Sequence, residues 1–179
     1  MDRIGVGLVG LGLALKPHAL SLLDLAHKID FIGGFSRSVE RRDWFRAQYG
    51  LPVAESLDVL LDDVRVAAII LLTPPRTHAE LAMLAAKAGK HVLLEKPLDV
   101  TLASARQIVD TVAAAKKKLG VVFQFRFRPS VRALREILAQ GDLGEIISAS
   151  ATIRWWRGAD YYAQPGGAAR WRATEVGCC

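Results

Sequence analysis

The sequence contains very little cysteine: its 179 residues include only two, Cys178 and Cys179, which are adjacent at the end. Such a pair cannot build a disulfide framework, so small secreted disulfide-linked proteins are excluded and a reducing, cytoplasmic location is expected. Long hydrophobic runs are also lacking, since none approaches the roughly 18 residues needed to span a bilayer. A strand pattern begins at Ile4, which leaves no room for a signal peptide. We therefore expect no membrane partner.

The chain also lacks the basic tract that is typical of nucleic-acid binding, although its formal net charge is +6. The basic residues are scattered, and the one run, 116–118, ends a predicted helix, where cations interact favourably with the helix dipole. We expect neither a nucleic-acid partner nor a metal site. A hydrophobic content of 51% with 23% charged residues indicates a globular protein. The length allows one full domain with part of another.

Strand and helix patterns alternate along most of the chain. Parallel neighbouring strands need crossover helices, so this alternation predicts an α/β fold with a doubly wound parallel Rossmann sheet. Continuous apolar runs, such as 67–72, are expected when helices cover both faces of the sheet. The six predicted strands are 4–9, 31–35, a short one at Val53, 67–72, 91–94 and 120–125. The first predicted helix ends near residue 26, and later ones cover 39–49 and 56–61. Two more helices are predicted to start after Thr77 and Thr101.

Two of these helices have clear end signals. Thr77 and Glu80 match the capping box T-x-x-E, in which each side chain hydrogen-bonds to the backbone of the other residue. Gly89 provides the stop at the end of the same helix. Thr101 is predicted to cap the next helix, whose apolar stripe includes Ile108 and Val112.

The pattern changes after about Arg128. One helix, 130–139, leads into a long strand pattern over 146–156 and then into an aromatic, glycine-rich stretch. A lone strand beside one helix leaves an unpaired edge and is not stable by itself. We therefore expect a dinucleotide-binding domain at 1–127 and, at 128–179, the incomplete beginning of an α+β second domain.

A glycine turn, Gly10-Leu11-Gly12, follows the first strand and opens a helix, which is the context of the dinucleotide fingerprint. The first glycine permits the tight turn, and the second lets backbone N–H groups approach a pyrophosphate. The third fingerprint position is Leu15 instead of Gly or Ala, so the match is incomplete. The alternative is a turn that serves only chain geometry.

The most informative element is Glu95-Lys96-Pro97, which follows the apolar run 91–94. A lysine at the carboxyl end of a buried strand lies at the crevice where open α/β sheets bind ligands. Proline removes a backbone donor, so the strand ends there. A glycine turn and a lysine at the same crevice indicate nicotinamide redox chemistry. The alternative is a solvated lysine at a strand end.

Other polar residues follow neighbouring strands. Thr73 and Pro74 end the fourth strand and could contact the ribose or nicotinamide, or could form only a strand-to-helix turn. His78 enters the following helix, where a structural histidine is an equal alternative to a site residue. Gln124, at the end of the last predicted strand, is a candidate cofactor contact, and its alternative is the ordinary polarity of an edge strand.

The second strand ends in Phe35-Ser36-Arg37-Ser38, with no acidic residue at the turn. NAD-preferring sites usually place Asp or Glu here to accept from the ribose 2′-hydroxyl. Ser36 can donate to a 2′-phosphate, and Arg37 offers a guanidinium fork for its oxygens. Glu40, the nearest carboxylate, is expected in the first turn of the next helix. The alternative is that Ser38 only caps this helix and that Arg37 is solvated. We expect NADP(H) to bind more tightly than NAD(H).

The order of these motifs resembles the Gfo/Idh/MocA family of NAD(P)-dependent sugar and polyol oxidoreductases. The resemblance implies that Lys96 is the catalytic residue, which lies near substrate and nicotinamide and contributes to proton transfer or carbonyl polarisation. It also implies that Glu95 and Pro97 shape the same wall, and that Trp171 and Arg172 pack near the cofactor from the second domain. Members carry a further catalytic histidine beyond this point, which this sequence lacks. The matching elements are Gly10-Leu11-Gly12, Thr73-Pro74-Pro75 with His78, Gly89-Lys90-His91-Val92, Glu95-Lys96-Pro97 and Trp171-Arg172.

This resemblance implies hydride transfer between a nicotinamide and a hydroxyl-bearing carbon of a sugar, polyol or related small molecule. The expected cofactor is NADP, with NAD as the alternative, and the full-length form is expected to be a homo-oligomer. The chain as given is expected to be poorly active because the substrate domain is incomplete. Two rivals remain open at this point: a non-catalytic dinucleotide-binding sensor of the same fold, and an inert fragment whose exposed edge leads to aggregation.

Overall fold

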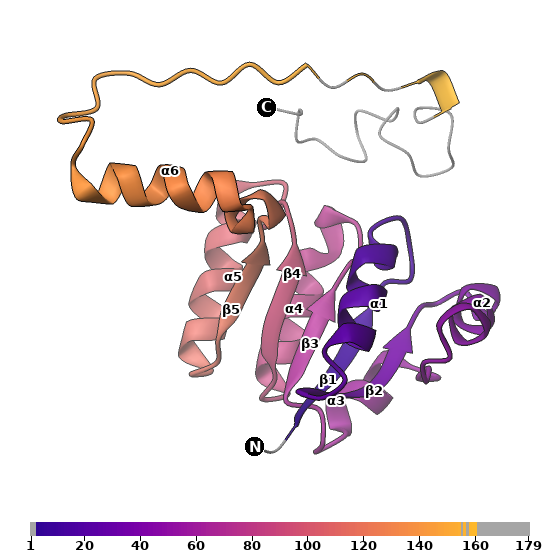
Figure 1. Cartoon of the computed structure of the whole chain (residues 1–179). Coiled ribbons are helices and arrows are strands. Elements are labelled where there is room, and N and C mark those ends of the chain that lie inside the picture. Colours follow the sequence, from indigo (N-terminus) through magenta and orange to yellow (C-terminus); the bar gives the residue numbers. More distant parts are fainter. Residues whose placement is uncertain (1–2, 155, 157, 161–179) are drawn as a thin grey trace. The chain divides into compact units, whose positions relative to one another are not determined.

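The computed structural model describes residues 3–154, 156 and 158–160. They belong to two compact units that divide after Val122, and each unit is described by itself (Figure 1). The predicted division of the chain into domains at 1–127 and 128–179 stays a prediction.

The first unit is built on a parallel sheet, which confirms the predicted doubly wound α/β class. The strand order is β2-β1-β3-β4-β5, so the chain leaves β1 in one direction and returns to its other side with β3. The carboxyl ends of β1 and β3 therefore flank the switch point where such sheets bind ligands. The strands are β1 (Ile4–Val9), β2 (Ile29–Phe35), β3 (Ala68–Leu71), β4 (His91–Glu95) and β5 (Leu119–Val122).

Helices cover both faces of this sheet and create two apolar cores (Figure 1). Helices α1 (Leu15–Asp24) and α2 (Val39–Tyr49) pack on one face, and α3 (Leu57–Asp62), α4 (His78–Lys87) and α5 (Leu102–Ala114) pack on the other. Successive strand residues point to opposite faces. Ile69 therefore packs in the core under α3, α4 and α5, and Ile70 packs in the core under α1 and α2. This explains why β3 is apolar without alternation.

Several helix ends form as the sequence predicts. The hydroxyl of Thr101 accepts the backbone N–H of Ser104 at the start of α5, at 3.1 Å. Gly89 ends α4 with φ +75°, and its N–H donates to the Ala86 carbonyl at 3.0 Å.

The predicted capping box at Thr77 is wrong. Thr77 has helical backbone angles, φ −102° and ψ −3°, and makes no cap hydrogen bond. Its hydroxyl donates instead toward the Thr73 hydroxyl and the Pro74 carbonyl, both at 2.8 Å. The cause is the short 3₁₀ turn η1 (Pro75–Thr77), which gives Thr77 a helical backbone before α4 begins. A capping residue needs an extended backbone instead.

The sheet has five strands, not the six predicted. Val53 forms only an isolated bridge with Gly34, because Ser56 already caps α3 three residues later. The last strand ends at Val122 instead of Phe125, since residues from Gln124 onward wind into a 3₁₀ turn.

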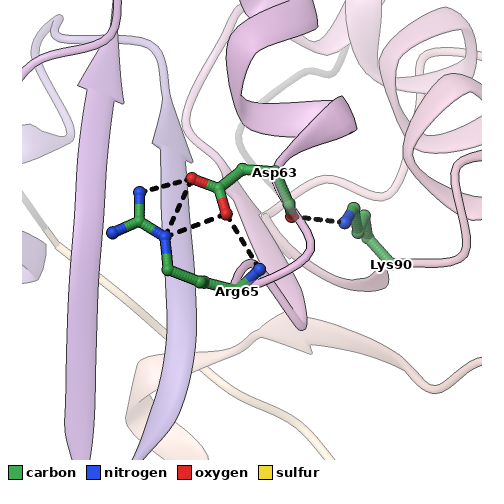
Figure 2. A network of polar contacts seen from close by, with 3 residues as sticks. All are labelled: Asp63, Arg65 and Lys90. Carbon is green, nitrogen blue, oxygen red and sulfur yellow. Dashed lines mark hydrogen bonds and ion pairs between the residues drawn. The ribbon is translucent and has the colours of Figure 1, made fainter.

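A polar network supports the opposite, amino-terminal edge of the sheet and accounts for Lys90 in the motif Gly89-Lys90-His91-Val92. Lys90 is only 7% exposed, and its ammonium donates to the Asp63 carbonyl at 2.8 Å. The Asp63 carboxylate turns the other way and accepts from the Arg65 guanidinium and backbone N–H (Figure 2). These groups join the loop before β3 to the start of β4, so they position the sheet and not its ligand crevice.

In the second unit, η2 (Gln124–Phe127) leads into α6 (Pro129–Gln140), which ends at Gly141 with φ +78°. The Arg128 guanidinium lies 4.4 Å from the ring centre of Phe125. The long strand predicted over 146–156 is wrong: none of the described residues of this stretch is in a strand. A strand pattern becomes a strand only where another strand supplies hydrogen-bond partners.

Within the described part of the chain, no helix combines the length and apolar character needed to cross a membrane.

Candidate functional site

The carboxyl ends of four adjacent strands bring the predicted site residues of the first unit to one edge of the sheet. Gly10, Ser36 and Lys96 directly follow β1, β2 and β4, and Thr73 lies two positions after the end of β3. Backbone hydrogen bonds link these ends: the Gly10 N–H donates to the Phe35 carbonyl at 2.9 Å. The loops that carry the candidate residues are therefore anchored directly to the sheet.

Gly10 is required by the fold itself. Its φ is +104°, and a Cβ atom there would lie 2.7 Å from the Leu72 carbonyl carbon. Leu11 is buried in the core under α1 and α2, so only its backbone is available to a ligand.

Gly12 is different, because the protein leaves room for a side chain there. Among the described residues, and apart from its two chain neighbours, only Arg41 Nη1 lies within 4 Å of its Cβ position, at an ordinary contact distance of 3.7 Å. Helix α1 then begins at Leu15 with no side-chain cap and no acidic residue in its first turn. An open backbone at a helix N-terminus suits a pyrophosphate. Leu15 at the third fingerprint position is fully buried in the core beneath α1.

Lys96 is exposed at the crevice edge, while the residues around it are held by the protein. Glu95, the last residue of β4, accepts the Lys96 backbone N–H at 3.1 Å through Oε2. Its other oxygen, Oε1, lies 2.8 Å from His18 Nε2, which donates to it from the first turns of α1. The Glu-Lys-Pro element is thereby connected to the helix that follows the glycine turn.

Opposing effects act on the Glu95 carboxyl. Its partial burial raises the pKa, but the hydrogen bond and the charge of His18, together with the Lys96 backbone N–H, outweigh burial and lower the pKa below its usual range. Glu95 is therefore an ionised acceptor that orients its neighbours, and not a proton donor at neutral pH.

His78 connects the loops after β3 and β4. Its ring is fully buried, with Nε2 2.9 Å from the Thr73 carbonyl oxygen and Nδ1 3.0 Å from that of Pro97. Nδ1 also lies 3.2 Å from the Leu98 carbonyl oxygen. Both ring nitrogens thus contact backbone carbonyl oxygens. His78 could affect cofactor binding only indirectly, by positioning the loops after β3 and β4.

Asp99 supplies the cap that Thr77 does not. Its Oδ2 accepts the Ala79 N–H in the first turn of α4 at 3.2 Å, and its Oδ1 accepts the Val100 N–H at 2.7 Å. The loop after Lys96 is therefore fixed to the start of α4 by a carboxylate as well as by His78.

At the end of β2, the cap predicted for Ser38 forms: its hydroxyl accepts the Arg41 N–H at 3.1 Å at the start of α2. It also donates to Glu40 at 2.7 Å, and this bond lowers the Glu40 pKa. The Ser36 hydroxyl accepts the Ser38 N–H at 3.4 Å, and Arg37 is exposed. Helix capping does not remove Ser36 and Arg37 as candidates for a phosphate.

Three residues near this edge were missed from the sequence: His18, Asp99 and Arg41. Arg41 Nη1 lies 3.7 Å from the position that a Cβ atom of Gly12 would take, so a guanidinium is close to the glycine turn. Its only sequence signal is its place in the first turn of a helix that starts at the end of β2. The next arginine, Arg42, is engaged elsewhere, donating to the Ser36 carbonyl at 2.6 Å.

The remaining candidates lie outside this unit. Gln124 begins η2 in the second unit and is exposed. Trp171 and Arg172 lie outside the described residues. No group of three or more His, Cys, Asp or Glu side chains in the described ranges could hold a metal ion.

Comparison with known proteins agrees with this geometry. Residues 4–123 match the family GFO_IDH_MocA, described as "Oxidoreductase family, NAD-binding Rossmann fold". The chain belongs to this family.

Individual relatives extend over most of the chain. Inositol 2-dehydrogenase of Rhizobium meliloti is 31% identical over 150 residues, which are 83% of this chain and 44% of that protein. The WlbA dehydrogenase from Bordetella pertussis, solved with NADH and UDP-GlcNAcA, has a TM-score of 0.75 at 26% identity and covers 80% of this chain and 44% of its own. The apo scyllo-inositol dehydrogenase from Lactobacillus casei has a TM-score of 0.73 at 27% identity, with coverage of 80% and 44%. The chain spans less than half the length of these relatives.

Proposed function

We propose that this protein is an NAD(P)-dependent oxidoreductase that transfers hydride between a nicotinamide and a hydroxyl-bearing carbon of a sugar or polyol. Family membership supports the dinucleotide, and relatives that act on inositol support the substrate class. Cytoplasmic location rests on the low cysteine content, and a homo-oligomeric full-length form stays a prediction from the resemblance.

One observation carries the dinucleotide part of the proposal. Gly12 is a glycine where the fold would accept a side chain, whereas Gly10 is a glycine because the backbone demands it. A residue that packing does not require to be small is explained by a ligand that approaches the backbone closely. The uncapped start of α1 beside it offers N–H groups to an anion.

Lys96 supplies the acid–base part of the proposed reaction. Oxidation of an alcohol releases a hydroxyl proton as well as a hydride, and the bound dinucleotide supplies the hydride acceptor. The Lys96 amine would take up that proton, and in the reverse direction would donate it. Its exposure at the edge of the crevice allows it to reach a substrate, and the surrounding hydrogen bonds fix the backbone from which it extends.

The preferred dinucleotide within this proposal is NADP(H). No carboxylate side chain immediately follows β2 to accept from a ribose 2′-hydroxyl, and Glu40 is turned toward the Ser38 hydroxyl. Ser36, Arg37 and Arg41 provide a hydroxyl and two guanidinium groups near this strand end, which suit a 2′-phosphate.

The test compares two glycine variants in NADPH fluorescence titrations and thermal unfolding. We expect Gly12→Ala to keep the parental melting temperature and to weaken NADPH binding by about 10-fold or more, since only the approach of the ligand is blocked. Gly10→Ala serves as the contrast and should lower the melting temperature, because of its positive φ and backbone clash. Parental NADPH affinity in Gly12→Ala, or no measurable binding by the parental chain, would refute the proposed dinucleotide-binding site at the glycine turn.

A further inference from the structure

His18 has no part in the site that the sequence predicts, yet it is one of the few side chains that join separate elements at the crevice edge. It lies in α1, and its partner Glu95 ends β4, 77 positions away in the sequence. The two side chains are 13% and 17% exposed, and the His18 Nε2 to Glu95 Oε1 distance is 2.8 Å. This is a well-shielded contact with charge-assisted geometry, unlike the exposed ion pairs that contribute little.

The Glu95 carboxylate uses its second oxygen on the reactive segment itself, because Oε2 accepts the Lys96 backbone N–H. One carboxylate therefore joins α1 to the backbone of Lys96. We propose that His18 is a positioning residue for Lys96: by holding the Glu95 carboxylate, it fixes the backbone from which the Lys96 amine reaches the crevice. This inference rests on the proposed function, since it assigns Lys96 the acid–base part.

The other side of Lys96 is fixed independently, which makes the contribution of His18 specific. His78 holds the carbonyl oxygens of Pro97 and Leu98 from α4. The Glu95 backbone is paired with Val122 of β5. Among the side-chain hydrogen bonds of the described residues, only the contact from His18 holds the Glu95 carboxylate from another element. A catalytic group gains precision when its neighbours are locked by such supporting contacts.

The experiment follows the Lys96 backbone amide by ¹⁵N NMR in the 179-residue chain without dinucleotide. This amide donates to Glu95, so its chemical shift reports the ionisation of that carboxylate and its hydrogen exchange reports the bond. In the parental chain the shift should respond only below the usual pH range of a glutamate, because His18 lowers the Glu95 pKa.

His18→Leu removes both the donor and the charge of His18. Burial is then opposed only by the backbone N–H and the charge of Lys96, so the Glu95 pKa rises. We expect the pH response of the Lys96 amide to move upward and its exchange to accelerate about 10-fold. His18→Gln keeps an N–H donor without a charge, so it should restore slow exchange while the pH response stays raised. Glu95→Gln should abolish the pH response and so assign it to this carboxylate.

His27→Gln is the matched control, since His27 is exposed near the end of α1 and should leave both readouts unchanged. If His18 had only a structural role, its substitution would change the melting temperature but not the pH response of the Lys96 amide. If His18→Leu does not fold, His18→Gln still tests the proposal. Unchanged pH response and exchange of Lys96 in His18→Gln and His18→Leu would overturn the proposal. The measurement needs no cofactor, so a failure of NADPH binding would refute the proposed function separately.

Discussion

The ammonium of Lys90 and the backbone carbonyl of Asp63 form a 2.8 Å hydrogen bond at the amino-terminal edge of the sheet. The contact joins the loop that enters β3 to the residue before β4, and Lys90 is almost completely buried. A lysine inside a motif that resembles a cofactor-binding family thus has a structural role, at the edge opposite the glycine turn.

Lys90→Met should destabilise the protein by about 1–2 kcal/mol, because the Asp63 carbonyl loses a charged donor while the aliphatic stem remains packed. Urea unfolding followed by circular dichroism measures this. Lys87→Met, at an exposed position of α4, is the control and should stay within about 0.5 kcal/mol of the parent. Equal stabilities of the two variants would show that the Lys90 bond contributes nothing.

Asp63 predicts a dependence of stability on pH. The hydrogen bonds from the Arg65 side chain and backbone lower the pKa of Asp63 from 3.8 to about 2. A carboxyl with a depressed pKa in the folded state stabilises the protein above its unfolded pKa, and this contribution is lost as the pH falls through the folded one. The stability difference between the parent and Asp63→Asn should therefore be constant above 3.8 and shrink toward pH 2. Thermal unfolding across this range checks it, and a difference independent of pH would contradict the ion pair.

In the full-length form, Lys96→Ala should reduce turnover of a polyol substrate by on the order of 10²-fold, the scale expected for a positioned acid–base group. NADPH affinity should change far less, because the glycine turn is unaltered. Initial rates of NADPH formation, together with the fluorescence titration, separate the two effects. Near-parental turnover would show that Lys96 has no chemical role.

The end of β2 predicts selectivity between dinucleotides. We expect the parental chain to bind NADPH about 10-fold more tightly than NADH, consistent with one or two charge-assisted contacts to the 2′-phosphate. Arg37→Ala and Arg41→Ala should each reduce this ratio without weakening NADH. Arg46→Ala, later in α2, is the control. Equal or tighter NADH binding by the parent would contradict the assignment of these arginines to the phosphate.

Much of the fold could be predicted because its signals are local. The apolar run of β3 and the stop at Gly89 each reflect one element, and together they specify a parallel sheet with a crevice at one edge. The positions of Gly10 and Lys96 follow from that, since each comes directly after a strand.

The contacts that complete the site are not local, and they could not be predicted in the same way. The His18–Glu95 bond depends on how α1 is rotated above the sheet. Thr77 has the composition of a cap, but the turn at Pro75 sets its backbone first, and Asp99 takes over from a distant loop. In each case the tertiary arrangement decides between local possibilities that the sequence leaves equal.

The buried ring of His78 also has a consequence for engineering. Because it bonds to Thr73 on one side and to Pro97 on the other, the segments after β3 and β4 are parts of one assembly. A loop taken from a relative and inserted at only one of these places would leave the imidazole facing carbonyl groups in the wrong positions. The two segments should therefore be exchanged as a pair, with the histidine between them, whenever the specificity of this crevice is redesigned.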